Sequence, residues 1–349
     1  MRLVVRCQVG DNSSYAFHSD IIIKGLQSRG YELCIIPYNQ CAWKRRLPKS
    51  IDDCLRRQPV FDAPQLIIHP PRHTSDDPKR TIYSTMWETT RIDPIFLYGL
   101  NASRALIVPS EQNILTFSAQ GVTPPMHQVP FGIDTDVFKP KDFIERDTLV
   151  FGTSGISRHG WPRKGFDEVI DAFLMAFPDE DDDVELRIKC YPRDPVPKYQ
   201  DPRIQLNKAE WRKPRLAKWY ESIDVFVCMS KGEGWGLMPH EAMACGRPSI
   251  IPIFFGLAGF CDQSVSFPVS YDLVPSTNYY EDRGLWANPS VEDAAAQMRS
   301  IYKNREPMYA KGKLGEVKAA EFTYDRMAGG YAKVIESYFG NKDATVKSV

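Results

Sequence analysis

The sequence lacks any apolar run long enough to cross a bilayer, which takes roughly 18–20 residues. Its start, MRLVVRCQVGDNSS, holds only a short apolar stretch that an arginine interrupts, so it predicts a first buried strand rather than a signal peptide. A surplus of charge is missing as well, because 44 Lys and Arg balance 44 Asp and Glu. That balance disfavours a globally basic nucleic-acid-binding protein and an acidic disordered tail.

Paired cysteines are also missing. The eight cysteines are scattered along the chain and none stands in a C-x-x-C pair, so a zinc ribbon is not expected. Several fall within predicted strands or helices, where cysteine packs as a small apolar residue. Because the sequence shows no export signal either, we expect a cytoplasmic, reducing environment and free thiols.

The length and the order of the apolar segments predict two α/β domains. At about 100–200 residues per domain, 349 residues suffice for two cores. Short apolar strands alternate with helical patterns in both halves, which favours parallel sheets covered on both faces. Ser110 and Thr323 stand where helix N-caps are expected. The polar stretch KPKDFIERD, residues 139–147, separates the halves, so we place the first domain at 1–140 and the second at 141–323.

The most informative motif is KGEGWGLMPHEAMACGRPSII, residues 231–251. With the apolar segment before it, it predicts a strand, a glycine-rich loop and a helix. Gly232, Gly234 and Gly236 have no Cβ, so the loop backbone can approach a ligand closely. The helix that begins near Leu237 offers unpaired N–H groups and the positive end of its dipole, which suit an anion such as a phosphate.

Two glutamates flank the start of this helix. Glu233 lies on the loop, and Glu241 lies about one turn into the helix. Carboxylates placed in this way suit hydrogen bonds to the hydroxyls of a sugar and of a ribose. A tight strand-to-helix turn with two solvated glutamates fits the spacing equally well.

This segment resembles the Glu-x7-Glu motif of retaining glycosyltransferases of the GT-B fold, close to their family 4 (glycosyl transferases group 1). The matching positions are Ser230, Glu233, Gly234, Gly236, Leu237, Glu241, Ala242, Ala244, Gly246 and Pro248. Three further stretches agree in order and distance: VPFGIDTDVFKP (129–140), FGTSGISRHGWPRKGFDEVIDAF (151–173) and WANPSVEDAAAQMR (286–299). The resemblance covers most of residues 105–300, and the first 100 residues match only in layout.

The resemblance implies two Rossmann-like domains that face each other across an interdomain cleft. The first would be the acceptor side, with a helix near 324–340 packing back on it, and the second would bind the nucleotide-sugar donor. Glu241 would bind the ribose and Glu233 the transferred sugar. The full donor-binding set would be Glu241, Gly234, Trp235, Gly236, Leu237 and, from the loop after the first strand, Gly10.

The leaving diphosphate needs either a metal ion or fixed cations to stabilise its charge. RHGWPRK, residues 158–164, supplies three permanent cations just before a predicted helix. The family usually has an arginine five residues before its lysine. Here Arg158 stands six residues before Lys164 and five residues before Arg163. We therefore favour Arg163 and Lys164 as the pair that grips the diphosphate, and with Glu233 they form the predicted catalytic set.

A metal site is not expected. The acidic run DEDDD, residues 179–183, falls between a helix and a strand without apolar residues, which is typical of a solvated turn. His69 and His73 are separated by two prolines, so they cannot share a helical face. We therefore predict transfer without a metal ion and without a cofactor.

The first half holds two further candidates. STMWETTRIDP, residues 84–94, follows a predicted strand where related enzymes often place a histidine near the reacting sugar. Trp87 and Glu88 stand there instead, so we interpret Trp87 as a packing residue and Glu88 as the group that orients the acceptor hydroxyl. AWKRRLPK, residues 42–49, could touch an acidic lipid surface or a charged acceptor, or could be a solvated loop.

The resemblance implies a hexosyl-type glycosyltransferase that moves a sugar from a UDP- or GDP-sugar to an acceptor hydroxyl with retention of configuration. The acceptor would be a glycan, a lipid carrier or another hydroxyl, and a nucleic acid is disfavoured. We expect a cytoplasmic enzyme that could contact a membrane peripherally. Two alternatives stay open: a sugar-nucleotide epimerase of the same fold, and a non-catalytic nucleotide-sugar-binding protein. A dehydrogenase is disfavoured because no G-x-G-x-x-G follows the first strand.

Overall fold

The computed structural model describes residues 1–10, 13–38, 47–60, 62–155, 163–194, 201–278 and 281–340. The chain forms two compact units. The first unit comprises Met1–Trp87, Ile92–Gly132 and the chain from Thr323 on, and the second comprises Glu88–Arg91 and Ile133–Phe322. The contacts therefore assign residues 88–91 and 133–140, which we had placed in the first domain, to the second unit.

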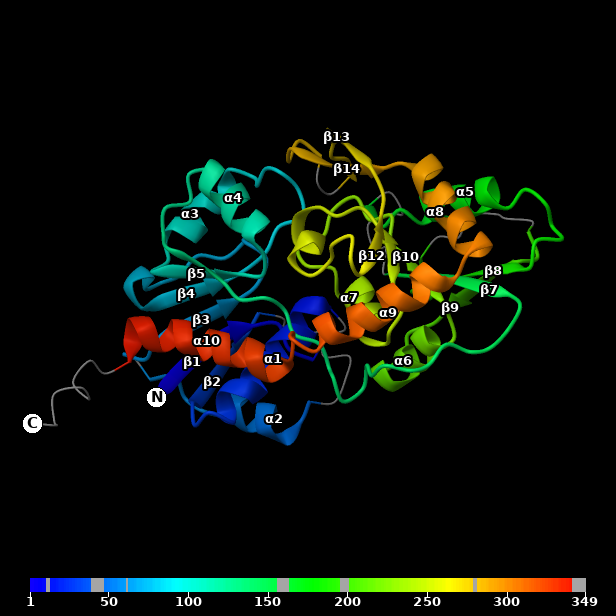
Figure 1. Ribbon diagram of the computed structural model, residues 1–349. Coiled ribbons are helices and arrows are strands. Elements are labelled where there is room, and N and C mark those ends of the chain that lie inside the picture. The colour runs from blue at the N-terminus through cyan, green and yellow to red at the C-terminus, as the bar shows by residue number, and fades with distance from the viewer. Residues whose placement is uncertain are drawn as a thin grey trace, which may run out of the picture. The chain divides into compact units, whose positions relative to one another are not determined.

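The first unit is built on a parallel sheet of six strands in the order β2-β1-β3-β4-β5-β6 (Figure 1). The strands are β1 Arg2–Cys7, β2 Glu32–Pro37, β3 Gln65–Ile68, β4 Thr81–Ser84, β5 Ala105–Val108 and β6 Met126–Gln128. The helices described in this unit are α1 Ser14–Gln27, α2 Lys49–Leu55, α3 Ile95–Asn101, α4 Glu111–Ala119 and α10 Tyr324–Phe339, with a 3-10 turn at Pro78–Arg80. Strands β4 and β5 are buried along their whole length, as expected for strands covered on both faces.

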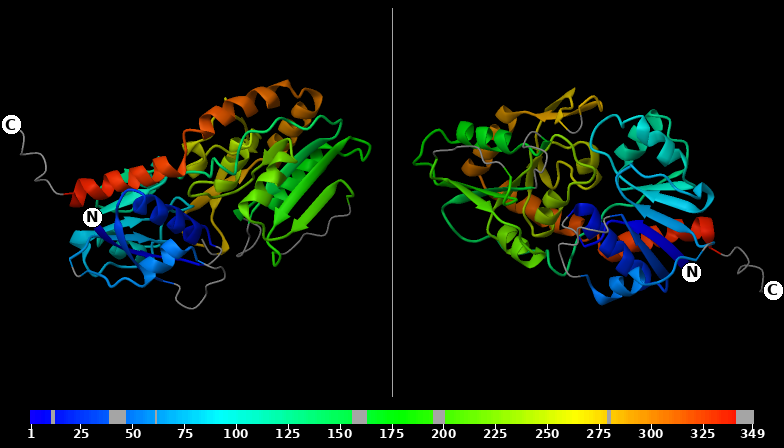
Figure 2. Two further views of the ribbon diagram at one scale, coloured as in Figure 1. Left: turned by 90° about the horizontal axis from the view of Figure 1, so that it is seen from below. Right: turned by 180° about the vertical axis from the view of Figure 1, so that it is seen from behind.

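Helix α10 packs along α1 in the first unit, and both Figures 1 and 2 show the two helices side by side. Tyr331 of α10 is buried, and its hydroxyl lies 3.0 Å from Nε2 of His18 on α1. The Arg29 guanidinium binds Asp325 at 2.6 Å. Thr323 accepts a hydrogen bond from the Arg326 N–H, which makes it the N-cap of α10 as the sequence predicts.

The second unit has its own parallel sheet of six strands, in the order β12-β11-β10-β7-β8-β9. The strands are β7 Leu149–Ser154, β8 Val184–Cys190, β9 Ile204–Lys208, β10 Val225–Val227, β11 Ser249–Ile251 and β12 Ser266–Pro268, with the antiparallel hairpin β13 Tyr271–Pro275 and β14 Leu285–Pro289. Strands β7, β8 and β9 run side by side in Figure 2. The helices described are α5 Phe166–Ala176, α6 Lys213–Glu221, α7 Leu237–Ala244, α8 Val291–Lys303 and α9 Glu306–Ala319, with a 3-10 turn at Phe255–Gly259. The prediction of an α/β protein with a parallel sheet in each half is confirmed.

The core of the second unit lies where α5 and α8 cover the sheet. Phe166, Val169, Ile170 and Phe173 recur at helical spacing along α5 and are all fully buried. They pack in one cluster with the apolar residues of β7, β8 and β10. This packing fixes the start of α5, just after the predicted cationic pair.

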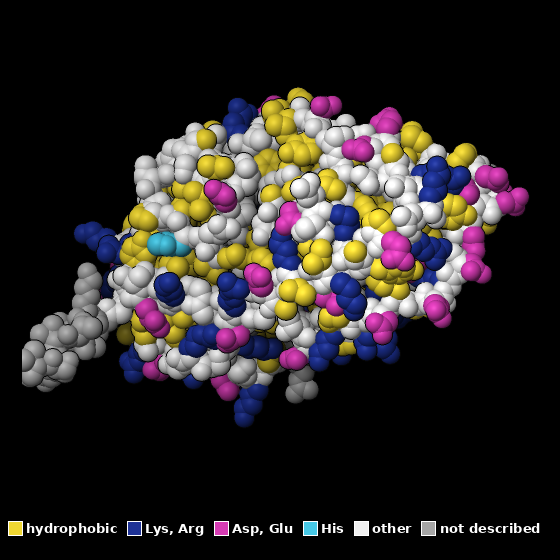
Figure 3. All heavy atoms as spheres, in the orientation of Figure 1, with side chains coloured by type: hydrophobic (Ala, Val, Ile, Leu, Met, Phe, Trp, Pro, Cys, Tyr) yellow, Lys and Arg dark blue, Asp and Glu magenta, His cyan; other side chains and the backbone are white. Residues whose placement is uncertain are grey.

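The surface shows no large area of one charge on the face drawn in Figure 3, where basic and acidic side chains lie intermixed. Across the described ranges, none of the helices combines the length and the apolar character that a bilayer crossing requires. Within the same ranges, no group of three His, Cys, Asp or Glu side chains is arranged to hold a metal ion. In the acidic turn, Asp182 pairs with Arg299 at 2.8 Å.

Candidate functional site

Two neighbouring strands of the second unit bring the predicted site residues to one edge of the sheet. Strand β7 leads toward α5 and the cationic pair, and strand β10 leads into the glycine-rich loop and α7. The two strands pair directly in parallel, so their carboxyl ends lie next to each other. Ligands of open α/β sheets bind at this edge.

The structure brings the three predicted catalytic residues together. The Lys164 ammonium donates a hydrogen bond to Oε1 of Glu233, and Nη1 of Arg163 lies 3.7 Å from Oε2 of the same carboxylate. The Ser230 hydroxyl also donates to Oε1, at 2.8 Å. The side chains of Lys164 and Glu233 are only 10% and 12% exposed, so this ion pair is largely shielded from solvent.

The charge state of Glu233 follows from these contacts. Burial alone would raise the pKa of its carboxyl. The charges of Lys164 and Arg163, together with the hydrogen bonds from Lys164 and Ser230, outweigh burial and hold the pKa below its ordinary value. Glu233 is therefore ionised at neutral pH.

Backbone hydrogen bonds fix the two loops against each other. The carbonyl of Arg163 accepts from the Lys231 N–H at 2.7 Å and lies 3.1 Å from the Ser230 Oγ. In return, Nη1 of Arg163 donates to the Gly232 carbonyl at 2.5 Å. The cations and the motif carboxylate are thus held in place by the main chain as well as by charge.

Glu88 also reaches this cluster. Its Oε1 lies 3.7 Å from Nη1 of Arg163, and its side chain is 20% exposed. We had assigned Glu88 to the first domain, but its contacts belong to the second unit. Its neighbour Trp87 is buried in the first unit, where its backbone N–H donates to the Asn113 side chain at 3.1 Å. The interpretation of Trp87 as a packing residue therefore agrees with its surroundings.

Glu241 has separate surroundings on α7. The Tyr220 hydroxyl donates a hydrogen bond to its Oε2 at 3.1 Å. Burial raises the pKa of the Glu241 carboxyl to about 7, although Lys213, Tyr220 and Lys189 act to lower it. Lys213 is itself paired with Asp134 at 3.4 Å. The carboxyl of Glu241 therefore titrates close to neutral pH.

The residues around Glu241 were not found from the sequence. Tyr220 and Lys213 come from α6, Lys189 from β8 and Asp134 from the start of the second unit, and no motif links them to Glu241. Only the fold brings these segments to α7. A helix of the composition KPRLAKWYE gives no sign that its tyrosine will meet a carboxyl group.

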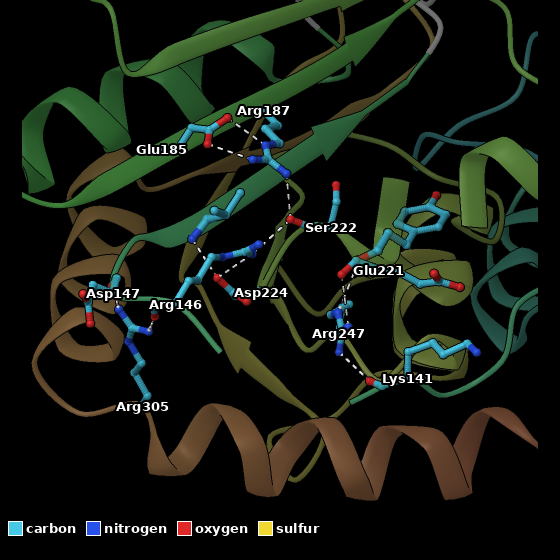
Figure 4. A network of polar contacts seen from close by, with 12 residues as sticks. Lys141, Arg146, Asp147, Glu185, Arg187, Glu221, Ser222, Asp224, Arg247 and Arg305 are labelled. Carbon is cyan, nitrogen blue, oxygen red and sulfur yellow. Dashed lines mark hydrogen bonds and ion pairs between the residues drawn. The ribbon is translucent and has the colours of Figure 1, made fainter. Parts of the chain in front are cut away.

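A buried arginine, Arg247, joins the ends of α6 and α7, and Figure 4 shows it pointing toward Glu221 and Lys141. Arg247 is fully buried, and its guanidinium lies 4.4 Å above the Phe143 ring. It donates to the backbone carbonyls of Tyr220 (3.3 Å), Glu221 (3.3 Å), Lys141 (2.9 Å) and Asp142 (3.1 Å). The backbone N–H of Arg247 bonds to the Ala242 carbonyl at 2.9 Å, so one residue fixes the end of α7 and the end of α6. The contact between Tyr220 and Glu241 spans these two helices.

The glycines of the motif serve the protein's own packing. A Cβ at Gly232 would clash with the carbonyl oxygen of Glu88. Gly236 has φ 99°, and a Cβ there would clash with the Leu257 side chain. Packing within the protein thus requires both glycines, and the approach of a ligand to this loop stays a prediction. Gly236 is the N-cap of α7, and Leu237 is its first residue.

The Trp235 side chain points into the core. It is 1% exposed and packs against Phe260 and Phe322, with ring centroids 5.3 and 5.7 Å away. Its Nε1–H donates to Nδ1 of His240 at 3.0 Å, and burial lowers the pKa of His240 to about 3. His240 is therefore neutral at physiological pH. Because this side chain is buried, Trp235 could contact a nucleotide-sugar donor only through its backbone.

Some predicted positions cannot be compared with this cluster. Gly10 belongs to the first unit, where it follows β1. Arg158 lies outside the described residues, and so do residues 42–46 of the basic segment. The roles of Gly10, Arg158 and that segment stay predictions.

Comparison with known proteins finds similarity in the same part of the chain. Residues 150–263 match the family model for glycosyl transferases group 1. A stretch of 125 residues is 32% identical to D-inositol 3-phosphate glycosyltransferase of Paenarthrobacter aurescens (strain TC1) and covers 36% of this chain and 26% of that relative.

Solved structures extend the likeness to the whole fold. Sucrose-phosphate synthase from Thermosynechococcus elongatus superposes with a TM-score of 0.69 at 14% identity, over 96% of this chain and 98% of that one. Anabaena HepE, solved in complex with UDP and glucose, gives a TM-score of 0.70 at 13% identity, over 97% and 100%. The resemblance seen in the motifs is thereby supported: residues 150–263 match the model of the glycosyl transferases group 1, and the fold is the GT-B fold of the solved glycosyltransferases.

Proposed function

We propose that the protein is a retaining, metal-independent glycosyltransferase that moves a sugar from a nucleotide-sugar donor to an acceptor hydroxyl. The observation that carries this proposal is the joint placement of Arg163, Lys164 and Glu233. Two cations stand with one ionised carboxylate where strands β7 and β10 end. Fixed cations at this edge are suited to a diphosphate, and an ionised carboxylate accepts hydrogen bonds from sugar hydroxyls.

Each group has a defined task in the proposed reaction. Cleavage of the sugar–phosphate bond leaves extra negative charge on the diphosphate, which Arg163 and Lys164 stabilise. The N-terminus of α7, at Gly236 and Leu237, adds oriented N–H groups to the same task. Glu233 binds the transferred sugar and Glu241 the ribose. The acceptor attacks from the face that the leaving group departs from, and a phosphate oxygen takes its proton, so no protein base is required.

The donor we favour is a UDP-sugar, with a GDP-sugar next. HepE was solved with UDP and glucose, and the trehalose-6-phosphate protein of E. coli was solved with UDP-2-fluoro glucose. The acceptor is a glycan, a lipid carrier or another compound with a hydroxyl group. We keep Glu88 as a candidate for contact with that acceptor.

The test is a thermal-shift panel of UDP-, GDP-, ADP- and TDP-sugars in buffer that contains EDTA. A bound donor raises the melting temperature by mass action, and the expected result is a shift with one nucleotide that EDTA does not abolish. The best donor is then incubated without an acceptor. Slow hydrolysis or no reaction agrees with a transferase, whereas formation of an isomeric nucleotide sugar would identify an epimerase. A shift without turnover on any acceptor tried would favour a non-catalytic binding protein.

A further inference from the structure

A short segment carries Glu88 to the donor loop. Residues 88–91, here called the 88–91 strap, have their contacts in the second unit, although Trp87 and Ile92 on either side belong to the first. The N–H of Thr90 donates to the Leu285 carbonyl at 2.9 Å, and the Leu285 N–H donates back to the Thr90 hydroxyl at 2.8 Å. The backbone of the strap is therefore anchored at the start of β14.

The other side of the strap lies against the motif. The carbonyl oxygen of Glu88 occupies the space that any Cβ at position 232 would need. From this position the Glu88 carboxylate reaches Nη1 of Arg163 at 3.7 Å. The same nitrogen lies 3.7 Å from Oε2 of Glu233, so two carboxylates share one guanidinium.

The charges of these side chains cancel. Arg163 and Lys164 bring two positive charges, and Glu88 and Glu233 bring two negative ones. A nucleoside diphosphate brings about two to three further negative charges near neutral pH, so its entry weakens a carboxylate contact of the cations. The Glu233 carboxylate is bound by Lys164 and Ser230 and is 12% exposed, whereas the Glu88 side chain is 20% exposed and therefore lies nearer to solvent. Of the two carboxylates, Glu88 is therefore the one that a diphosphate can displace from Arg163 more easily.

We propose that Glu88 is an affinity-determining residue of the donor site, which competes with the donor's diphosphate for Arg163. This proposal rests on the proposed function. The carboxylate of Glu88 repels the diphosphate and offers the guanidinium an alternative partner. Glu88 thereby weakens the binding of the nucleoside diphosphate and favours its release once the sugar has been transferred.

The experiment measures dissociation constants of inorganic pyrophosphate and of UDP by calorimetry, for the wild type and Glu88→Gln, in EDTA at about 50 mM salt. Glutamine keeps the shape of the side chain and removes its charge. The dissociation constant should fall about five- to twentyfold for both probes, and the gain should shrink as salt screens the charges. Glu88→Asp, which draws the carboxylate back by one methylene, should lie between the two.

Two control variants separate local charge from other effects. Glu145→Gln removes one exposed negative charge elsewhere in the second unit, and Thr90→Val removes a hydrogen bond of the strap without a change of charge. Neither should tighten binding. An unchanged or larger dissociation constant in Glu88→Gln would overturn the inference, and so would equal tightening in Thr90→Val. Tighter pyrophosphate binding by Glu88→Gln, with no binding of UDP or GDP by any variant, would support the competition and overturn the proposed function.

Discussion

The two glutamates of the motif lie eight residues apart, yet their surroundings act in opposite directions. Burial raises the pKa of both carboxyl groups. Glu233 has Lys164 and Arg163 at contact distance, and the net effect is a lowered pKa. Glu241 has a neutral tyrosine hydroxyl at contact distance, and its pKa rises to about 7. The spacing of the motif fixes where the two acids stand, whereas residues from other segments fix their charge.

The largest effect is expected from removal of Lys164, the cation that pairs with Glu233. Lys164→Gln should lower kcat/KM for sugar transfer about 100- to 1,000-fold, the range observed when one preorganised group for a developing negative charge is lost. Lys218→Gln, which neutralises an exposed lysine on α6, is the matched control and should retain activity. Steady-state kinetics with the best donor of the panel measures both. A loss below tenfold for Lys164→Gln would remove Lys164 from the diphosphate site.

The next effect concerns stability and has opposite signs at the two glutamates. Because the folded-state pKa of Glu241 is raised from 4.5 to about 7, its contribution to stability is fully present below 4.5 and is lost as the pH rises toward 7. Glu241→Gln cannot ionise, so it avoids this loss. As the pH rises from 5 to 8, the free energy of unfolding of the variant should therefore increase by about 1–3 kcal/mol relative to that of the wild type. Urea unfolding across this pH range measures the difference.

Glu233→Gln should behave in the opposite way. The lowered pKa of Glu233 contributes stability above its ordinary value of 4.5, and that contribution is lost as the pH falls through the folded-state pKa. The variant should therefore be less stable than the wild type at neutral pH, and the deficit should shrink in acid. If the two variants responded to pH with the same sign, the contrast between the two sites would be wrong.

The smallest effect tests the hydrogen bond from the Tyr220 hydroxyl to the Glu241 carboxylate. Tyr220→Phe keeps the ring, which packs against Phe138 and Phe226, and removes the hydroxyl that bonds to Oε2. The hydrogen bond stabilises the ionised carboxylate, so its loss should move the titration midpoint of Glu241 upward from about 7, by up to about one pH unit. A midpoint that moves downward would contradict this account.

The sequence predicted those parts of the site that depend on local order. A strand, a glycine-rich loop and a helix follow one another along the chain, so the positions of Glu233 and Leu237 can be inferred from spacing alone. The partnership of Glu233 with Lys164 was also within reach, because parallel strands place their following loops at one edge. The order of the strands, in contrast, depends on crossover connections that spacing does not determine.

What the sequence did not predict depends on distant segments. Glu88–Arg91 have their contacts in the second unit, although the residues before and after them belong to the first unit. Nothing in the composition of this segment indicates that change. His69 and His73 illustrate the same limit. Their prolines exclude a shared helical face, yet a non-helical turn brings the ring centroids to 4.2 Å, and His73 stacks on Tyr38 at 3.9 Å. Packing of this kind can be seen only in three dimensions.

The central claim is that Glu233 and Glu241 bind two ends of one nucleotide sugar. The most direct measurement is carboxyl NMR of protein labelled with glutamate δ-¹³C, with the two signals assigned from Glu233→Gln and Glu241→Gln and followed during titration with UDP-glucose. Both signals should move along a single binding curve and yield the same dissociation constant. Movement of only one of them, or two different constants, would contradict the account.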